Sequence, residues 1–309
     1  MPSKRDLKRA AWFTFGVEAL CRARPKAPRV YACPLCLRGF DDPEMLSFED
    51  VPPKSIGGKP LVLTCRACNN RFGHLLDVNI RSGRDLRKMA EGKREAWIKL
   101  SHAGQTITAK AMFSPGGSIR VAGVPEKSNP KAHESLFKNL DEIVAHGSLG
   151  WDFTIGLSSR HNSWRESVGW LRVAYLYVFA ALGYNLILRP ELNVVREQFQ
   201  LPDDRVVPQA MKHTGNTSSG DGISFVYAPQ HLRSVLVRLG VNMFLFPAFS
   251  EAATFYERLA SVPQSDKDMT ISGTHIDLPK RPWFEFDYHP SSMWLTLPAE
   301  ERPGPKRSV

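Results

Sequence analysis

Alternation of hydrophobic and polar residues predicts strands in the middle third of this chain. In the middle third, apolar side chains occupy every second position of three runs that are joined by glycine-containing turns. That period is typical of half-buried antiparallel strands. The predicted strands are 97–100, 106–112, 118–124, 151–157, 224–227, 234–239 and 243–246.

Longer stretches with helical spacing alternate with these runs. A helix is expected to begin at Pro130, with Asn129 placed as its cap. Residues 202–222 are polar and are predicted to form a loop. The predicted helices are 7–21, 130–146, 163–183, 191–200 and 251–259, and 80–95 is expected to be a polar helix or a surface arm.

The most apolar stretch, Val168 to Leu188, is interrupted by Arg172, Gly183 and Asn185. A transmembrane helix would need about 20 cleaner residues. We therefore expect a buried core helix and no membrane association. Because the N-terminus also lacks a signal-peptide pattern, we expect a cytoplasmic protein.

Composition and charge narrow the functional classes. The chain has 309 residues, of which 42% are hydrophobic and 23% charged, which excludes collagen-like, coiled-coil and wholly disordered proteins. Its 41 Lys+Arg exceed its 31 Asp+Glu, giving a net charge of +10. Residues 1–99 alone hold 20 Lys+Arg and 11 Asp+Glu. This excess indicates either a solvated surface or a polyanionic partner. The more specific hypothesis is a nucleic-acid partner, and DNA is preferred to RNA.

Four of the five cysteines form two C-x-x-C pairs, Cys33 with Cys36 and Cys65 with Cys68. Two such pairs are the usual ligand set of a structural zinc ion. The alternatives are free buried cysteines, or a redox pair, which would need only one C-x-x-C and a βαβ context. Cys21 is expected to be a partly buried apolar residue rather than a ligand.

Two segments lie between and after these pairs, Leu46 to Gly58 (LSFEDVPPKSIGG) and Leu61 to Asp77 (LVLTCRACNNRFGHLLD). The order and spacing of their residues resemble the motif of the HNH endonucleases. The resemblance covers residues 31–78 and implies a treble-clef ββα-metal fold. It also implies that Glu49 and Asn69 hold a catalytic divalent ion, Mg²⁺ or Mn²⁺.

This sequence departs from the family at Asp50, where HNH enzymes place the histidine that acts as general base. An aspartate is a weak base unless burial raises its pKa. The site is therefore either a nuclease with altered chemistry or a degenerate module kept for its zinc fold. His74 could supply the missing base, because Asn70, His74 and Asp77 would share one helical face.

Each of these residues also has an ordinary structural interpretation. His74 and Asp77 could lie on a solvated face, Asn69 could be only a helix N-cap, and Glu49 with Asp50 could be an acidic strand end. Pro52-Pro53 and Gly57-Gly58 are expected to shape the loop between two strands. The cations that would position a phosphate backbone, or simply be solvated, are Lys54, Lys59, Arg66 and Arg71.

The sequence thus predicts an α+β protein. Its parts would be a basic N-terminal segment (1–30), an HNH-like zinc module (31–80), a larger mixed α+β domain of unknown role (96–298) and a flexible tail (299–309). The expected function is metal-dependent phosphodiester hydrolysis on a nucleic acid, with Glu49, Asp50, Asn69 and His74 as candidate catalytic residues. The alternatives are a non-catalytic zinc-dependent nucleic-acid-binding module and a protein-interaction scaffold.

Overall fold

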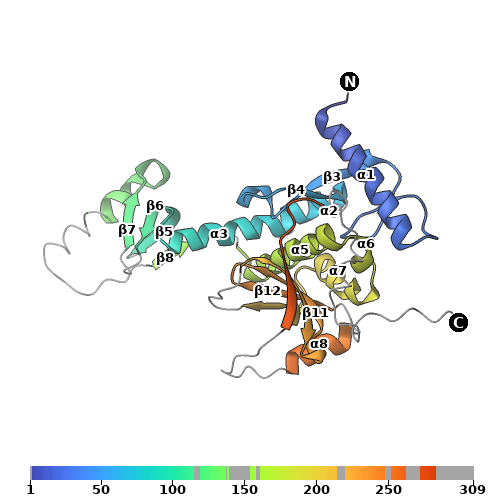
Figure 1. The fold of residues 1–309 in the computed structure, drawn as a ribbon. Coiled ribbons are helices and arrows are strands. Elements are labelled where there is room, and N and C mark those ends of the chain that lie inside the picture. The colour runs from blue at the N-terminus through green and yellow to red at the C-terminus, as the bar shows by residue number, and fades with distance from the viewer. Residues whose placement is uncertain are drawn as a thin grey trace. The chain divides into compact units, whose positions relative to one another are not determined.

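The computed structural model (Figure 1) describes residues 2–102, 104–114, 119–136, 138, 154–157, 161–213, 220–247, 252–261 and 272–282. The chain forms two compact units: unit 1 comprises Met1–Asp77 with Trp164–Val309, and unit 2 comprises Val78–Ser163. Both contain helices and sheets, so the α+β class is confirmed. The units do not coincide with the predicted ranges 31–80 and 96–298, because the cysteine-bearing segment belongs with the C-terminal half.

The N-terminal part of unit 1 combines one long helix with two small antiparallel hairpins. Helix α1 starts at a capping box, in which the Ser3 and Asp6 side chains each bind the other's backbone N–H. The elements are α1 (Lys4–Ala23), β1 (Tyr31–Ala32), β2 (Gly39–Phe40), β3 (Leu46–Val51), β4 (Lys59–Cys65), α2 (Arg66–Phe72) and the π-helical turn η3 (Gly73–Asp77).

The C-terminal part of unit 1 places helix α5 (Ser163–Leu182) against a five-stranded antiparallel sheet with the order β13-β10-β11-β12-β9. The ring of Tyr175 on α5 lies 6.2 Å from that of Phe246 on β12. From Val168 to Leu182 nearly every residue of α5 is buried, as predicted for a core helix. The other elements are α6 (Tyr184–Ile187), α7 (Asn193–Gln200), β9 (Met211–His213), β10 (Gly222–Ala228), β11 (Ser234–Leu239), β12 (Asn242–Pro247), α8 (Ala252–Ser261) and β13 (Ser272–Asp277).

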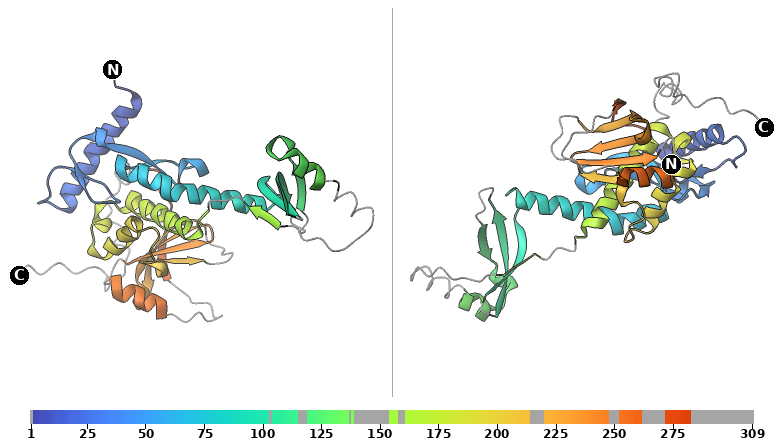
Figure 2. Two further views of the ribbon diagram at one scale, coloured as in Figure 1. Left: turned by 180° about the vertical axis from the view of Figure 1, so that it is seen from behind. Right: turned by 90° about the horizontal axis from the view of Figure 1, so that it is seen from below.

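Unit 2 consists of a helix and a four-stranded antiparallel sheet with the order β7-β6-β5-β8, seen from two further sides in Figure 2. One face of the sheet carries the unit's hydrophobic core, to which the helical turn at 130–136 adds Ala132 and Leu136. Its elements are α3 (Val78–Ala90), β5 (Ala96–His102), β6 (Gln105–Phe113), β7 (Ile119–Gly123) and β8 (Thr154–Leu157).

Short 3₁₀ turns connect these elements in both units. They are η1 (Pro43–Met45), η2 (Lys54–Ile56), η4 (Pro125–Lys127), η5 (Pro190–Leu192), η6 (Pro208–Ala210) and η7 (Gln230–Leu232).

Most predicted elements are confirmed, with two corrections. The predicted loop 202–222 contains strand β9, and strand β13 was not predicted. The predicted tail 299–309 and residues 139–146 of the predicted helix 130–146 lie outside the described residues. In the part of the chain that the structure describes, no helix is both long and apolar enough to cross a membrane.

Candidate metal centre

The four paired cysteines come together from two separate turns. Cys33 and Cys36 lie in the turn between β1 and β2. Cys65 ends β4 and is the N-cap of α2, and Cys68 lies in the first turn of that helix. The unpaired N–H groups at a helix N-terminus carry a partial positive charge. This placement therefore suits negatively charged thiolates.

The sulfur geometry fits a tetrahedral metal ion. All four Sγ atoms lie within 4.8 Å of one another. The Cys36 and Cys65 sulfurs are 3.8 Å apart, and Zn–S bonds of about 2.3 Å place tetrahedral sulfurs about 3.8 Å from each other. Backbone N–H groups of Cys65 and Cys68 donate to the sulfurs of Cys33 and Cys65 at 3.3 and 3.4 Å. The cluster could therefore hold a metal such as zinc.

Electrostatics in the cluster favour thiolates at two of its positions. Hydrogen bonds from the neighbouring thiols, that of Cys33 first, lower the pKa of Cys36 to about 7 and also lower the pKa of Cys65. Burial raises the pKa of Cys33. A bound cation would be needed to hold all four sulfurs as thiolates together.

Tyrosines of α5 and α6 support the cysteine turn. The hydroxyl of Tyr175 on α5 donates to the carbonyl of Pro34, between the first two cysteines, at 3.1 Å. The hydroxyl of Tyr184 on α6 donates to the carbonyl of Ala32 at 2.6 Å. These bonds, spanning more than 140 positions, explain why the cysteine-bearing segment is not a separate unit.

The predicted acidic pair lies at an irregularity in hairpin β3–β4. The register between the strands shifts between Glu49 and Asp50. The strict inside–outside alternation fails here, since the neighbouring residues Phe48 and Glu49 are both buried, whereas Asp50 is half-buried. Bulges commonly redirect side chains in this way. The two carboxylates therefore face different surroundings although they are adjacent in sequence.

Glu49 is committed to a buried charge network. Its Oε1 lies 2.7 Å from Nη1 of Arg172, and its Oε2 accepts from the hydroxyl of Thr64 at 3.1 Å. The other arm of the Arg172 guanidinium binds Asp77. The side chains of Arg172 and Glu49 are 0% and 3% exposed. One cation thus occupies the space between two carboxylates, at a site where the sequence predicted a divalent ion.

The pKa values reflect this burial. Burial raises the pKa of both Glu49 and Asp77, and the Arg172 charge offsets only part of the effect. Burial also acts to lower the pKa of Arg172, but the two carboxylates raise it by more. The pKa of Asp50 is raised by burial as well, against the opposing charges of Lys54 and Arg5.

Asn69 ties helix α2 to strand β3. Its Nδ2 donates to Ser47 Oγ at 2.9 Å and to the carbonyl of Phe48 at 3.0 Å. The N-cap of α2 is Cys65, so the alternative that Asn69 is only a helix cap is wrong. Its amide nitrogen therefore binds the strand that carries Glu49.

His74 and Asp77 diverge because their helical turn is not regular. Both lie in the π-helical turn η3, whose wider winding changes the direction of successive side chains. His74 is exposed, whereas Asp77 reaches Arg172. The shared face of Asn70, His74 and Asp77 assumed α-helical spacing, which does not hold across this turn.

The cations predicted to contact phosphates differ in how many contacts they already make within the protein. Lys54 and Lys59 are exposed, and neither has an ion pair among the described residues. Arg66 pairs with Glu44 at 3.5 Å, and both side chains are exposed. Arg71 is held by hydrogen bonds of 2.6 Å to the side chain and to the carbonyl of Gln200.

Two glycines shape the loop that carries Lys54, as predicted. Gly57 has φ 99°, a left-handed conformation that other residues adopt at a cost. A Cβ atom on Gly58 would lie 1.4 Å from the carbonyl oxygen of Pro52, so only glycine fits there.

Arg172 is the site residue that sequence reasoning missed. From Val168 to Leu182, it is the only charged residue. A charge buried in such a helix requires a partner elsewhere in the fold. That rule could have identified Arg172 as a residue with a buried partner. It could not have shown which carboxylates Arg172 binds.

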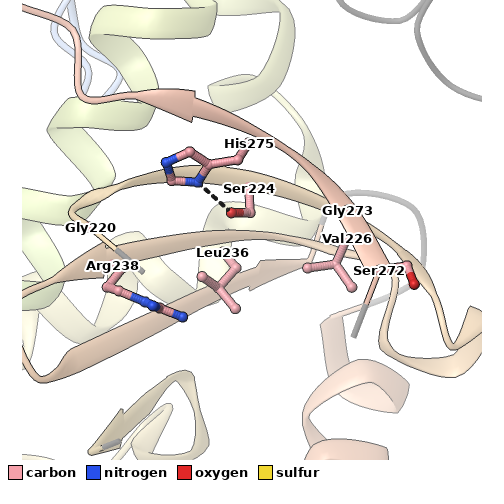
Figure 3. A pocket seen from close by; sticks show the side chains of 8 residues that line it. All are labelled: Gly220, Ser224, Val226, Leu236, Arg238, Ser272, Gly273 and His275. Carbon is pink, nitrogen blue, oxygen red and sulfur yellow. Dashed lines mark hydrogen bonds between the residues drawn. The ribbon is translucent and has the colours of Figure 1, made fainter. Parts of the chain in front are cut away.

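A second feature is a pocket of about 360 Å³ over strands β10, β11 and β13 (Figure 3). Ser224 Oγ and His275 Nδ1 are 3.0 Å apart, with Arg238 on the same sheet. A Cβ on Gly222 would meet the His275 ring at 2.2 Å, so glycine makes room for it. Within the described residues no third group orients His275, as a nucleophile–base pair would require.

Comparison with known proteins does not assign the chain to a family. No protein-family model matches it, no curated protein matches its sequence, and no solved structure matches its fold. The resemblance to HNH endonucleases therefore rests on residues 31–78 alone.

Proposed function

We propose that this protein is a zinc-stabilised nucleic-acid-binding protein, built on a treble-clef frame of the HNH type but without a catalytic divalent ion. This is the non-catalytic alternative of the two interpretations of the motif.

The observation that carries the proposal is the position of Arg172. Its guanidinium lies between Glu49 and Asp77 and supplies positive charge to both carboxylates. A divalent ion bound by Glu49 would have to displace that guanidinium, leaving a buried arginine short of partners. Removing one member of a buried ion pair costs about 3–5 kcal/mol. Binding of Mg²⁺ does not readily offset such a cost, because this ion gives up its water reluctantly.

Support for a nucleic-acid partner comes from cations around hairpin β3–β4. Arg5 of α1 lies over the ring of Phe48, 5.6 Å from its centroid, so α1 runs beside β3. Arg5 and Lys54 both act on the carboxyl of Asp50. Exposed cations from two elements thus lie close enough to one half-buried carboxylate to act on it, and cations of this kind suit contacts with a phosphate backbone.

The test is DNA binding by the zinc-loaded full chain at a series of salt concentrations. The proposal predicts that log K falls linearly with log salt. The double change Lys54→Ala and Lys59→Ala should weaken binding and reduce that slope by about 0.9 for each phosphate that is no longer neutralised. Lys280→Ala removes an exposed lysine outside this region and should leave the slope unchanged. Salt-independent binding, or no binding, would reject the proposal.

A metal-dependent endonuclease is the second candidate, and Asp50 favours it. Burial raises the pKa of Asp50, as a carboxylate general base requires, and the side chain remains partly exposed. In this candidate Asp50 would accept the proton of the attacking water. Glu49 and Asn69 could hold the divalent ion only after releasing Arg172 and strand β3. Plasmid nicking with Mg²⁺ or Mn²⁺ that is lost in Asp50→Asn would favour this candidate.

A further inference from the structure

The outer face of the unit 2 sheet carries an aromatic residue among lysines. The inner face is apolar and belongs to the hydrophobic core, which includes Ile98, Ile107 and Ala109. Because side chains alternate along a strand, residues at the intervening positions point away from that core. Trp97 on β5 is one of them, and it is 45% exposed.

Basic side chains surround this tryptophan. Lys110 lies directly opposite Trp97 in the strand register, with its Nζ 5.3 Å from the ring centroid. The Nζ of Lys127 lies 4.1 Å from the same ring. Lys99 shares the face and donates to the hydroxyl of Thr108 at 2.8 Å. Arg120 on β7 is exposed and pairs with Met112, which puts it on this face too.

We propose that this face binds single-stranded nucleic acid, with a base stacked on Trp97 and phosphates paired with Lys99, Lys110 and Lys127. The inference rests on the proposed function, namely that the chain binds nucleic acid, and it adds a second surface specific for unpaired strands. A duplex offers phosphates but no exposed base face, and an acidic peptide would use the lysines without needing the flat ring. The combination of ring and cations matches a single strand best.

The lysines near the ring do not block a base. An exposed cation–π contact is weaker than stacking of a base on an aromatic side chain, so a base can displace it. The freed ammonium groups are then placed to meet phosphates. Lys110 also pairs with Glu95 at 3.3 Å, but both groups are exposed, and such pairs contribute little.

The experiment measures binding of the full chain to an oligothymidylate and to a duplex, for the wild type, Trp97→Ala, Trp97→Phe and Lys127→Ala. Because Trp97 is exposed, these variants should fold, which circular dichroism checks. We expect Trp97→Ala to weaken oligothymidylate binding about tenfold or more. Trp97→Phe should recover most of the loss, Lys127→Ala should reduce the salt dependence, and duplex binding should stay unchanged.

Two results would overturn the inference, and they can be told apart. If the wild type binds both nucleic acids and Trp97→Ala binds the oligothymidylate as tightly, this surface is not used, while the proposed function stands. If the wild type binds neither, the proposed function and this inference fail together.

Discussion

At the scale of single residues, Arg172 determines what the carboxylates around it can do. It is fully buried and meets Glu49 and Asp77 from the stretch of α5 between Val168 and Leu182, which holds no other charged residue. The same contacts that satisfy this charge occupy the carboxylate that the motif resemblance would assign to a divalent ion. On this geometry we propose that the use of Glu49 is structural rather than catalytic.

Replacing Arg172 tests how much the fold depends on it. Arg172→Met leaves the buried Glu49 and the partly buried Asp77 without their cation and should lower the free energy of unfolding by about 3–5 kcal/mol. The matched control on the same helix is Arg165→Met, which breaks the more exposed pair with Asp203. That change should cost about 1 kcal/mol or less. Urea denaturation measures both, and equal effects would show that the buried network is not a main source of stability.

The raised pKa values of Glu49 and Asp77 predict a pH dependence of unusual sign. Each carboxyl holds its proton to a higher pH in the folded chain than in the unfolded one, whose carboxyls titrate near pH 4. The folded state therefore binds more protons in the window above pH 4. The contribution of these groups to the free energy of unfolding must fall as the pH rises through that window.

The measurement is the difference in unfolding free energy between the wild type and Asp77→Asn across that window. The free energy of unfolding of the wild type minus that of Asp77→Asn should fall as the pH rises, since only the wild type has the Asp77 carboxyl to deprotonate. A difference that grows with pH would mean that the Arg172 charge outweighs burial at Asp77.

At the scale of secondary-structure elements, the cysteine cluster joins pieces that are too short to persist alone. Strands β1 and β2 have two residues each, and isolated hairpins are marginal even when longer. Through Cys33 and Cys36 their turn meets the end of β4 and the start of α2. A metal ion at this point would fix four elements together.

We therefore predict one tightly bound zinc per chain, and its loss in Cys65→Ser. The variant should also lose structure in the segment that carries the cysteines, because structural zinc contributes directly to folding. Metal analysis and amide hydrogen exchange measure the two effects. Cys21→Ser, which changes the one cysteine outside the cluster, should keep its zinc. Purified wild-type protein without stoichiometric zinc would refute the prediction.

Elements with a strong local pattern were predictable from the sequence, and elements defined by distant contacts were not. Strands β5 and β6 have clear apolar periodicity, β11 has a continuous apolar run, and the C-x-x-C spacing indicated the cluster. Strand β13 is mostly exposed and depends on pairing with β10, about fifty residues earlier. The Glu49–Arg172 pair joins positions 123 residues apart, so no local pattern reveals it. The bulge beside Glu49 and the π-helical turn that ends at Asp77 were likewise not predicted from the sequence.

At the scale of the whole molecule, the cysteine-bearing segment is not an independent module. Residues 1–77 form one unit with residues 164–309, in which α5 and α6 supply Arg172 and the tyrosine hydroxyls that hold the cysteine turn. Unit 2 is inserted between these two stretches and presents its own basic, aromatic face. We therefore propose nucleic-acid contacts in both units and zinc in unit 1.

Arg172, rather than a divalent ion, occupies the carboxylate site, and Mn²⁺ binding tests this central claim most directly. Zinc-loaded full chain would be titrated with Mn²⁺, with and without a DNA duplex, while electron paramagnetic resonance reports the free ion. We predict that wild type and Glu49→Gln bind Mn²⁺ equally weakly, without a stoichiometric site. One tight Mn²⁺ per chain in the wild type, absent in Glu49→Gln, would contradict the claim and favour a metal-dependent nuclease.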